Sequence, residues 1–426
     1  MKYFNYLLIT TFILFFTACS QKEVQIADLT EYSQNPTSYT KNLNEIKLDQ
    51  ENLAKEFIKN YYSVWKQDKL SFSKKESTWG NNYAKKKIYL ENHNLASKQW
   101  FEKQIENSNF DEFNTSLQKA ILVKNSDFRV FPTSSKMFYN PKKAGEGFPF
   151  DYNQNSRVKI NTPVLISHFS KDKAWAFVES HFVLGWIRVD NLLIVDKNQE
   201  QEFKSDELYV ITKEGFEIFD KTILEDLKVG TFFPKKDGKY ILATTNGLKK
   251  VDILENKIHK LPLPFNSKNI ESISKEFMGE LYGWGGLNNH RDCSSFTQDF
   301  FSVFGIYLER NSRAQTKLHK YIDLSKMSNY QKKEYIKENA IPFLTLVYLR
   351  GHIMLYIGIK DDEPLVMHNI WGVRTTDIFS GSGRNIVGKT VITTLEPGVE
   401  LRDVNKSKTI LNNIRGIVLL NEKKED

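Results

Sequence analysis

The chain has 426 residues, of which 40% are hydrophobic and 13% aromatic, and its formal net charge is +8 at pH 7. This length suggests roughly two to four domains, and the composition is that of an ordered globular protein, which excludes an intrinsically disordered chain. The lysines are spread along the sequence, so the charge favours an anionic environment or substrate and argues against a nucleic-acid-binding protein.

The N-terminus is typical of an exported lipoprotein. After Lys2 comes an apolar run, "YLLITTFILFF", which is shorter than the about 20 apolar residues of a membrane span. Small residues then lead to Cys19, which resembles the lipidated first residue of bacterial lipoproteins, and Ser20 favours the outer membrane. Cleavage after Ala18 with a soluble product is the alternative. We expect a signal peptide at residues 1–19 and a polar tether with little structure at residues 20–45.

The next part of the chain changes from helical to β-rich patterns. "ENLAKEFIKNYYSVWKQ" places its large apolar side chains on one helical face, which predicts a helical segment over residues 46–120. Short apolar and β-branched runs then predict two small antiparallel barrels, at residues 121–198 and 204–262. In the first barrel, "GWI" resembles the closing strand of bacterial SH3-like domains. After a linker at "LPLPF", residues 266–420 combine helices with apolar strands, so the expected fold class is α+β and multidomain.

Cys293 is the candidate nucleophile, because lipidation of Cys19 leaves it as the only free thiol of an exported protein. In "YGWGGLNNHRDCSSF", Asp292 is placed to cap a helix that begins at the cysteine. The positive end of the helix dipole should favour the thiolate and lower its pKa to about 3.5–7.5. The glycines predict a tight loop that leaves room for a substrate backbone. Taken alone, a buried structural cysteine is the simpler interpretation.

Two histidines supply a candidate base and an orienting group. His352 begins an apolar strand in "RGHIMLYIG", and His368 lies in the next one, "LVMHNIWG". Neighbouring antiparallel strands would bring the imidazoles together, so that His352 takes the thiol proton and His368 holds its tautomer. Each histidine alone would more often be a core residue. A zinc site built from His290, Cys293, His352 and His368 is an alternative, although no CxxC or HExxH motif supports it. The sequence also lacks a P-loop, a dinucleotide fingerprint and a GxSxG elbow.

In this order, "YGWGG", "DCSSF", "GHIMLYIG" and "MHNIWG" resemble the NlpC-type cysteine peptidases of bacterial cell walls, which have a papain-like fold. The resemblance covers roughly residues 270–400. It implies that Cys293 is the nucleophile, His352 the base, and His368 the residue that orients the base.

The resemblance also implies a set of substrate-binding residues. One lies before the glycines, two flank the nucleophile, and three belong to "RNSRAQ", a stretch that otherwise reads as a capped helix start. Upstream, "GFPFDYNQNSRV" resembles the first of two SH3-like domains that follow a helical stabilising segment in relatives. In those relatives, the first SH3-like domain restricts the active site to peptides with a free amino end. For Asp151 and Tyr152, packing within the loop is the simpler interpretation. The candidates are Tyr282, Asp292, Ser294, Arg310, Ser312, Gln315, Asp151 and Tyr152.

The sequence departs from the family pattern at two places. Ser295 replaces the usual glycine after "DCS", which could narrow the substrate pocket. "PFLTLVYLRG" replaces the usual Gly-Asp-Leu before the strand of His352.

By this resemblance, the expected reaction is hydrolysis of the bond between the γ-carboxyl of D-glutamate and meso-diaminopimelate in peptidoglycan stem peptides. The chemistry is acyl transfer through Cys293 without a cofactor, with the backbone N–H of Cys293 among the oxyanion donors. The expected partners are stem peptides or muropeptides, and a membrane reached through the lipid anchor, which places the protein in the periplasm. A catalytically inactive wall-binding adaptor, and an amidase or transpeptidase that uses the same thiol, stay open as alternatives.

Overall fold

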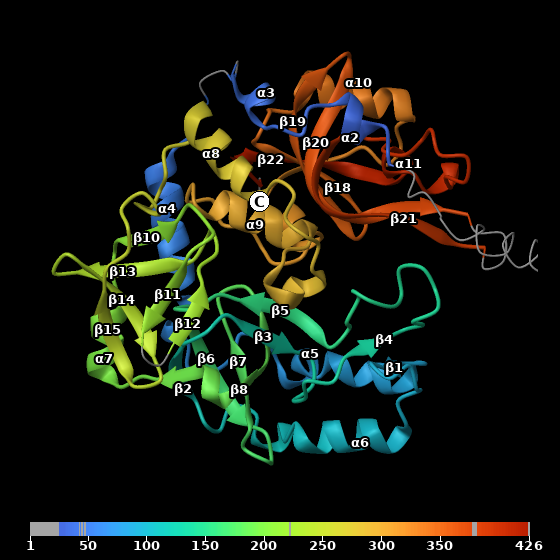
Figure 1. The fold of residues 1–426 in the computed structure, drawn as a ribbon. Helices are drawn as coiled ribbons and strands as arrows, with labels where there is room; N and C mark the ends of the chain where they lie inside the picture. Colours follow the sequence, from blue (N-terminus) through green and yellow to red (C-terminus); the bar gives the residue numbers. More distant parts are fainter. Residues whose placement is uncertain are drawn as a thin grey trace, which may run out of the picture.

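The structure is a computed structural model, and it describes residues 25–41, 43, 46, 48–220, 223–376 and 381–424. The predicted signal peptide, with Cys19, lies outside the described residues. Figure 1 shows a helical N-terminal region, a β-rich middle and a C-terminal α+β region packed against one another. Within the described residues, no helix combines the length and the apolar character that crossing a membrane requires.

The helical region confirms the fold class predicted for this part of the chain. Its main helix, α4, begins after Asp49, whose side chain accepts a hydrogen bond from the Asn52 N–H, and it buries Phe57 and Tyr61. The helices and 3-10 turns are α4 (Gln50–Tyr61), η1 (Ser63–Lys66), α5 (Lys74–Ser77), η2 (Trp79–Lys85), α6 (Lys98–Asn107) and η3 (Phe110–Glu112).

Residues 25–41 differ from the predicted tether, for which we expected little structure. Ile26 is buried against the C-terminal region. The side-chain amide of Gln34 forms hydrogen bonds with the backbone N–H and carbonyl of Ile392, which lies in the edge strand of the C-terminal sheet. Asp28 accepts hydrogen bonds from the N–H and the hydroxyl of Thr394, at 2.6 and 2.8 Å. A polar segment is ordered here because a neighbouring strand satisfies its hydrogen bonds. We call residues 25–41 the N-terminal strap; its helices are α2 (Asp28–Glu31) and α3 (Thr37–Thr40).

The middle of the chain is β-rich, as predicted. Its first sheet has the strand order β5-β3-β8-β7-β6-β2-β9, and the second has the order β15-β14-β13-β10-β16 with the hairpin β11–β12 beside it. The first set comprises β2 (Gln118–Leu122), β3 (Ser126–Arg129), β5 (Gln154–Val158), β6 (Pro163–Phe169), β7 (Trp175–Glu179), β8 (Leu184–Arg188), η4 (Val189–Asn191) and β9 (Leu192–Ile194). A small pair, β1 (Tyr89–Leu90) and β4 (Met137–Phe138), flanks it. The second set comprises α7 (Lys197–Phe203), β10 (Leu208–Ile211), β11 (Glu217–Asp220), β12 (Ile223–Asp226), β13 (Phe232–Lys236), β14 (Lys239–Thr244), β15 (Gly247–Val251) and β16 (Ile258–Lys260).

The C-terminal region is an antiparallel sheet with helices packed on it, which is the α+β layout that the sequence predicts. The strand order is β17-β22-β18-β19-β20-β21, and α9 packs against β19 and β20. The helices and 3-10 turns are α8 (Ser267–Phe277), η5 (Trp284–Asn289), α9 (Cys293–Ser302), η6 (Ala314–Thr316), α10 (Asn329–Asn339), η7 (Lys406–Lys408) and α11 (Ile410–Asn413). The strands are β17 (His319–Asp323), β18 (Thr345–Leu349), β19 (His352–Lys360), β20 (Glu363–Thr375), β21 (Gly383–Thr393) and β22 (Ile414–Lys423).

A single hydrophobic cluster connects the three regions. It joins α4, the second sheet and α9 through side chains such as Phe57, Phe232 and Phe300. The segment "LPLPF", which reads as a linker in the sequence, is part of this cluster because Leu261 and Leu263 are buried in it. The regions therefore form one body that holds the N-terminus of α9 in place, rather than modules on a flexible chain.

Candidate active site

Cys293 is the first residue of α9, where the sequence places it. Asp292 caps the helix: its Oδ1 accepts from the N–H groups of Ser294 and Ser295 at 3.1 and 2.8 Å. The hydroxyl of Ser295 accepts from the Asp292 N–H at 2.9 Å and completes a capping box. The expectation that Ser295 narrows the substrate pocket is therefore not met, because its hydroxyl is turned into the helix cap.

Arg310 holds Asp292 in its charged form. The guanidinium forms a bidentate pair with the carboxylate, with N–O distances of 3.1 and 2.7 Å, and its Nε donates to Ser156 of the first sheet at 2.7 Å. Burial raises the pKa of Asp292, but the paired guanidinium and the cap hydrogen bonds outweigh it and keep that pKa below its usual value. Arg310 and Asp292 thus fix the start of α9 against the first sheet.

Ser294, Gln315 and Ser312 differ in how far they face open space. The hydroxyl of Ser294 donates to Asp292 and accepts from Arg310. The Gln315 side chain is fully buried, donates to the Ser294 carbonyl at 2.9 Å and accepts from Thr297. It supports α9 from inside and does not line the cavity beside Cys293, whereas Ser312 and Ser294 do.

The two histidines meet as the sequence predicts. His352 begins β19 and His368 lies in β20, and His352 Nε2 is 2.8 Å from His368 Nδ1. His368 Nε2 lies 3.1 Å from the hydroxyl of Thr393, which itself donates to the carbonyl of Thr394 at 2.7 Å. Thr393 was not found by sequence reasoning, because a threonine at the end of a strand belongs to no motif.

These contacts determine the tautomer of each ring. The Thr393 hydroxyl donates its hydrogen bond to a carbonyl oxygen. In its contact with His368, the Thr393 oxygen must therefore be the acceptor, and His368 Nε2–H must be the donor. His368 Nδ1 is then the acceptor, and His352 must donate from Nε2. The Nδ1 lone pair of His352 is therefore left to accept a proton from another group.

The pKa values of Cys293 and His352 describe a resting site without charge on either residue. Burial, with the negative charge of Asp292 adding to it, raises the pKa of the Cys293 thiol to about 12, although the N–H of Ile353 hydrogen-bonds to the sulfur and opposes this. Burial lowers the pKa of His352 to about 4 and lowers that of His368 well below its ordinary value. The sequence-based expectation of a low thiol pKa is wrong for this structure, because Cys293 is only 7% exposed and loses more from desolvation than the helix dipole supplies.

Two neighbouring cavities are lined by residues of this group. A cavity of about 700 Å³, which we call the Cys293 cavity, is lined by Cys293, Asp292, Ser294, Arg310, Ser312, Tyr282, Tyr152, Trp284 and Glu76, among others. A cavity of about 340 Å³, which we call the His352 cavity, is lined by His352 and by residues of β20, β21 and α11. Tyr282, Trp284 and Gly351 belong to both, so the two cavities meet at the candidate catalytic group.

Tyr152 and Asp151, predicted together, lie in different surroundings. Tyr152 lines the Cys293 cavity and its ring lies 5.8 Å from that of Trp284. Asp151 is fully buried, and its carboxylate accepts from the N–H groups of Met137 and Asn153 and from Arg129. Asp151 does not line the cavity, so its predicted contact with substrate is replaced by a structural role in shaping the loop that carries Tyr152.

Gly285 and Gly286 of "YGWGG" make room for the first sheet, and Gly285 also lines the Cys293 cavity. Gly285 and Gly286 have φ angles of 60° and 85°, which glycine adopts without strain. A Cβ at Gly285 would lie 2.9 Å from Gln154, and one at Gly286 would lie 2.4 Å from the Cβ of Arg157. Strand β5 thus packs directly on η5 and forms a wall next to the Cys293 cavity.

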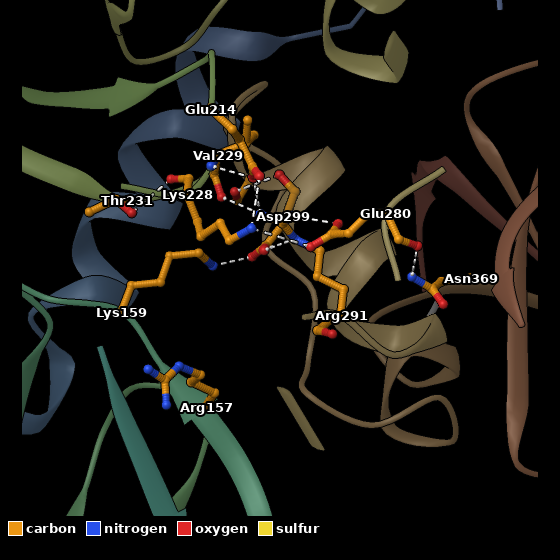
Figure 2. Close-up of polar contacts among 12 residues, drawn as sticks. Arg157, Lys159, Glu214, Lys228, Val229, Thr231, Glu280, Arg291, Asp299 and Asn369 are labelled. Atoms are coloured by element: carbon orange, nitrogen blue, oxygen red, sulfur yellow. Dashed lines mark hydrogen bonds and ion pairs between the residues drawn. The ribbon is translucent and has the colours of Figure 1, made fainter. Parts of the chain in front are cut away.

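A buried ionic network lies behind the nucleophile and is shown in Figure 2. Arg291, next to Asp292 in sequence, pairs with Glu214 and Glu280 at 2.7 Å each and with Asp299 at 2.6 Å. Lys228 adds a second cation on Glu214, and Lys159, which directly follows β5 of the first sheet, pairs with Asp299. Because Glu214 and Lys228 come from the second β-rich unit, the network ties the start of α9 to both sheets. Figure 2 also labels the neighbouring residues Val229, Thr231, Asn369 and Arg157.

The zinc alternative gains no support from the arrangement of side chains. In the part of the chain that the structure describes, no group of three or more His, Cys, Asp or Glu residues could hold a metal ion. The alternative set was His290, Cys293, His352 and His368.

Comparisons with known proteins give the domains their families. Residues 279–383 match the NlpC/P60 family, residues 8–113 match the N-terminal NLPC_P60 stabilising domain, and residues 136–188 match an SH3 domain of the SH3b1 type. No curated protein matches the chain.

Among solved structures, the chain is similar to an NlpC/P60 endopeptidase from Photobacterium damselae subsp. piscicida, with 25% identity and a TM-score of 0.83 over 92% of this chain and 98% of that chain. An NlpC/P60 family protein from Bacillus cereus ATCC 10987 matches at 15% identity and a TM-score of 0.46, over 70% of this chain and 98% of that one. The C-terminal region of the chain therefore belongs to the NlpC/P60 family of cysteine peptidases that hydrolyse cell walls, and the family's stabilising domain and an SH3 domain precede it.

Proposed function

We propose that the protein is a peptidoglycan peptidase that cuts the bond between the γ-carboxyl of D-glutamate and meso-diaminopimelate, with Cys293, His352 and His368 as its catalytic residues. The observation that carries the proposal is the hydrogen-bonded series from Thr393 through His368 to His352, which leaves one imidazole nitrogen ready to accept a proton. The N–H of Ile353, the residue after His352, reaches the Cys293 sulfur, so the free nitrogen belongs to the strand beside the thiol.

The reaction that this arrangement supports is acyl transfer. His352 Nδ1 takes the thiol proton as the Cys293 sulfur bonds to the substrate carbonyl carbon, and the backbone N–H of Cys293 donates to the oxyanion. Collapse of the intermediate breaks the C–N bond, and the proton passes from His352 to the leaving amine. A water molecule, deprotonated by His352, then attacks the thioester carbonyl. The C–S bond breaks as the acid is released, and the proton passes from His352 to the Cys293 sulfur, which restores the thiol.

The acyl part of the substrate would occupy the Cys293 cavity. Asp292 and Glu76 are the acidic side chains among the described residues that line it; because Arg310 already pairs with Asp292, Glu76 offers the negative charge for a free amino end. Tyr152, Tyr282 and Trp284 supply aromatic surface around them. This replaces Asp151 by Glu76 in the proposed recognition of the amino end.

We also propose that Cys19 is lipidated and that the protein is held on the periplasmic side of the outer membrane. Five residues, 20–24, separate Cys19 from the strap, and the six Cα–Cα steps from Cys19 to residue 25 can span at most roughly 22 Å. The anchor would then keep the peptidase region close to the membrane. Metabolic labelling with a radioactive fatty acid, compared between the full chain and Cys19→Ser, tests this, since label that persists in the variant would contradict it.

Mass spectrometry of a defined muropeptide tests the proposed reaction. The full-length chain and Cys293→Ala are each incubated with the peptide with and without its glycan. We expect cleavage between D-glutamate and diaminopimelate by the wild type alone. If both proteins bind the peptide and neither cuts it, the adaptor alternative replaces the proposal, and a product of any other mass points to the amidase or transpeptidase alternative.

A further inference from the structure

The His352 cavity carries a strong positive charge that the proposed mechanism does not use. Its described lining contains basic side chains and no acidic one, and none of these basic side chains forms an ion pair with another described residue. They are Arg350, Arg374, Arg384, Lys408 and Arg415.

Arg384 is the most confined of these side chains. It lies directly opposite Arg374 in the β20–β21 register, so two guanidinium groups share one end of the cavity. Burial, together with the charge of Arg374, lowers the pKa of Arg384 to about 10. The loop of the SH3 domain at residues 136–188 passes close by, since a Cβ at Gly145 would lie 3.1 Å from the Arg384 guanidinium. A positioned guanidinium without a protein counter-ion is a ready partner for a carboxylate of a ligand.

The position of the cavity tells which part of a substrate it faces. The scissile carbonyl must lie at Cys293, and the leaving amine must reach the base at His352. Cys293 lines one cavity and His352 lines the other, and the two meet at Tyr282, Trp284 and Gly351. The part of the substrate beyond the leaving amine therefore enters the His352 cavity.

We propose that the His352 cavity is the leaving-group subsite and that Arg374 and Arg384 bind a free carboxylate at the far end of the leaving diamino acid. This rests on the proposed function, because it assumes that Cys293 and His352 cut a stem peptide. Phe150 and Trp371, whose rings lie 6.1 Å apart, line the same cavity and can hold the aliphatic chain between the two ends of the diamino acid.

The absence of acidic side chains from the described lining makes the subsite selective. Diaminopimelate ends in both a carboxylate and an ammonium group, whereas lysine, otherwise alike, ends in an ammonium group alone. A lysine leaving group would place an uncompensated cation among arginines, which like-charge repulsion disfavours.

Two tripeptides that differ only in that carboxylate test the proposal. kcat/KM of the full-length chain is measured for L-Ala-γ-D-Glu-meso-diaminopimelate and for L-Ala-γ-D-Glu-L-Lys. We expect the first to be preferred by about 10-fold or more. Arg374→Gln combined with Arg384→Gln should remove most of this preference by slowing the first substrate. Arg374→Gln alone should reduce the preference for the diaminopimelate peptide in part. Because Arg374 is exposed, this single variant still tests the proposal if the double variant folds poorly.

Arg402→Gln is the matched control, because it removes an exposed arginine from the same region that does not line the cavity. It should leave the preference unchanged. A double variant that keeps the wild-type preference would overturn the proposal, and so would a wild type that cuts both peptides equally well.

A binding measurement separates this proposal from the proposed reaction. Calorimetry with free meso-diaminopimelate, lysine and inorganic phosphate reports on the subsite whether or not any peptide is cut. We expect diaminopimelate to bind the wild type at least 10-fold more tightly than lysine, and the double variant to lose that difference. Phosphate that binds more tightly than diaminopimelate would indicate a general anion site instead, and would overturn the assignment to the leaving group.

Discussion

Thr393 is the residue on which the protonation of the candidate catalytic group depends. Its hydroxyl donates to one carbonyl and accepts from His368, so it dictates which nitrogen of each ring carries a proton. Without that acceptor, the Nε2–H of a fully buried histidine would lack a partner. A buried unpaired donor costs about 1–3 kcal/mol, which is enough to favour the other tautomer of His368.

The first prediction concerns Thr393→Val, which keeps the shape of the side chain and removes its hydroxyl. We expect kcat to fall about 10- to 100-fold with little change in KM. The substitution changes the tautomer of His368, and with it the orientation of the base His352, but it leaves the substrate-binding residues unchanged. Steady-state kinetics on a stem peptide measures this. Thr390→Val is the matched control: Thr390 lies on the same strand, is fully buried, and its hydroxyl has no hydrogen-bond partner among the described residues. An equal loss of kcat in both variants would contradict the role of Thr393.

The second prediction concerns pH. The base acts only when His352 is neutral, and burial lowers its pKa to about 4, so kcat/KM should hold from neutral pH down to about pH 5 and fall through about pH 4. An acid limb near pH 6.5, the value of an exposed imidazole, would contradict this burial effect. Thermal unfolding at each pH is the control. The unfolded chain binds a proton at this imidazole near pH 6.5 and the folded chain does not until about pH 4, so stability also decreases as pH falls through that window.

At the scale of elements, the patterns of the sequence predicted most of the site. The apolar runs gave β19 and β20, and Asp292 gave the start of α9, because caps and periodicity are local properties of the chain. The thiol pKa and the position of Asp151 were not predictable, since both depend on burial by segments far away in sequence. The N-terminal strap was missed for the same reason, because its hydrogen bonds are completed by Thr394 and the neighbouring strand.

The third prediction tests whether the strap supports the site. Asp28→Ala removes the carboxylate oxygen that accepts from both the N–H and the hydroxyl of Thr394, the residue whose carbonyl accepts from the Thr393 hydroxyl. We expect faster hydrogen exchange in residues 25–41 and at Thr394, and a loss of kcat of a few-fold. Glu31→Ala, an exposed acidic residue on the same helix, is the control and should change neither. Faster exchange with an unchanged kcat would show that the strap is held on the sheet without influence on the catalytic group.

At the scale of the whole molecule, the nucleophile is held by three parts of the chain that the sequence presents as separate modules. The first sheet packs on the glycines of η5, and α4 shares a core with α9. The second β-rich unit supplies Glu214, which pairs with Arg291, and Lys228, which pairs with Glu214. Three cations, Arg291, Lys228 and Lys159, face three carboxylates, Glu214, Glu280 and Asp299, in a setting that is mostly closed to water. Such a cluster fixes a geometry because any displaced member leaves a buried charge without a partner.

The last prediction follows from that balance. Arg291→Met removes the central cation and leaves the carboxylates with Lys228 and Lys159 alone, so we expect a loss of about 3–5 kcal/mol in the free energy of unfolding at neutral pH. In the wild type, burial raises the pKa of Glu214, but Arg291 and Lys228 outweigh it and bring that pKa to about 2. The stability that Glu214 contributes is then present above its unfolded pKa near 4.5 and is lost as pH falls toward 2.

The difference in the free energy of unfolding between variant and wild type should therefore be smaller at pH 4 than at pH 7. Burial raises the pKa of Glu280, so Glu280 is protonated first as the pH falls, and its protonation removes part of the repulsion between the unpaired carboxylates of the variant. Urea unfolding at both pH values measures this, with Arg402→Met as an exposed control that should behave as the wild type. A loss of the same size at both pH values would mean that Arg291 stabilises through its packing on Phe277, 4.6 Å away, and not through the carboxylates.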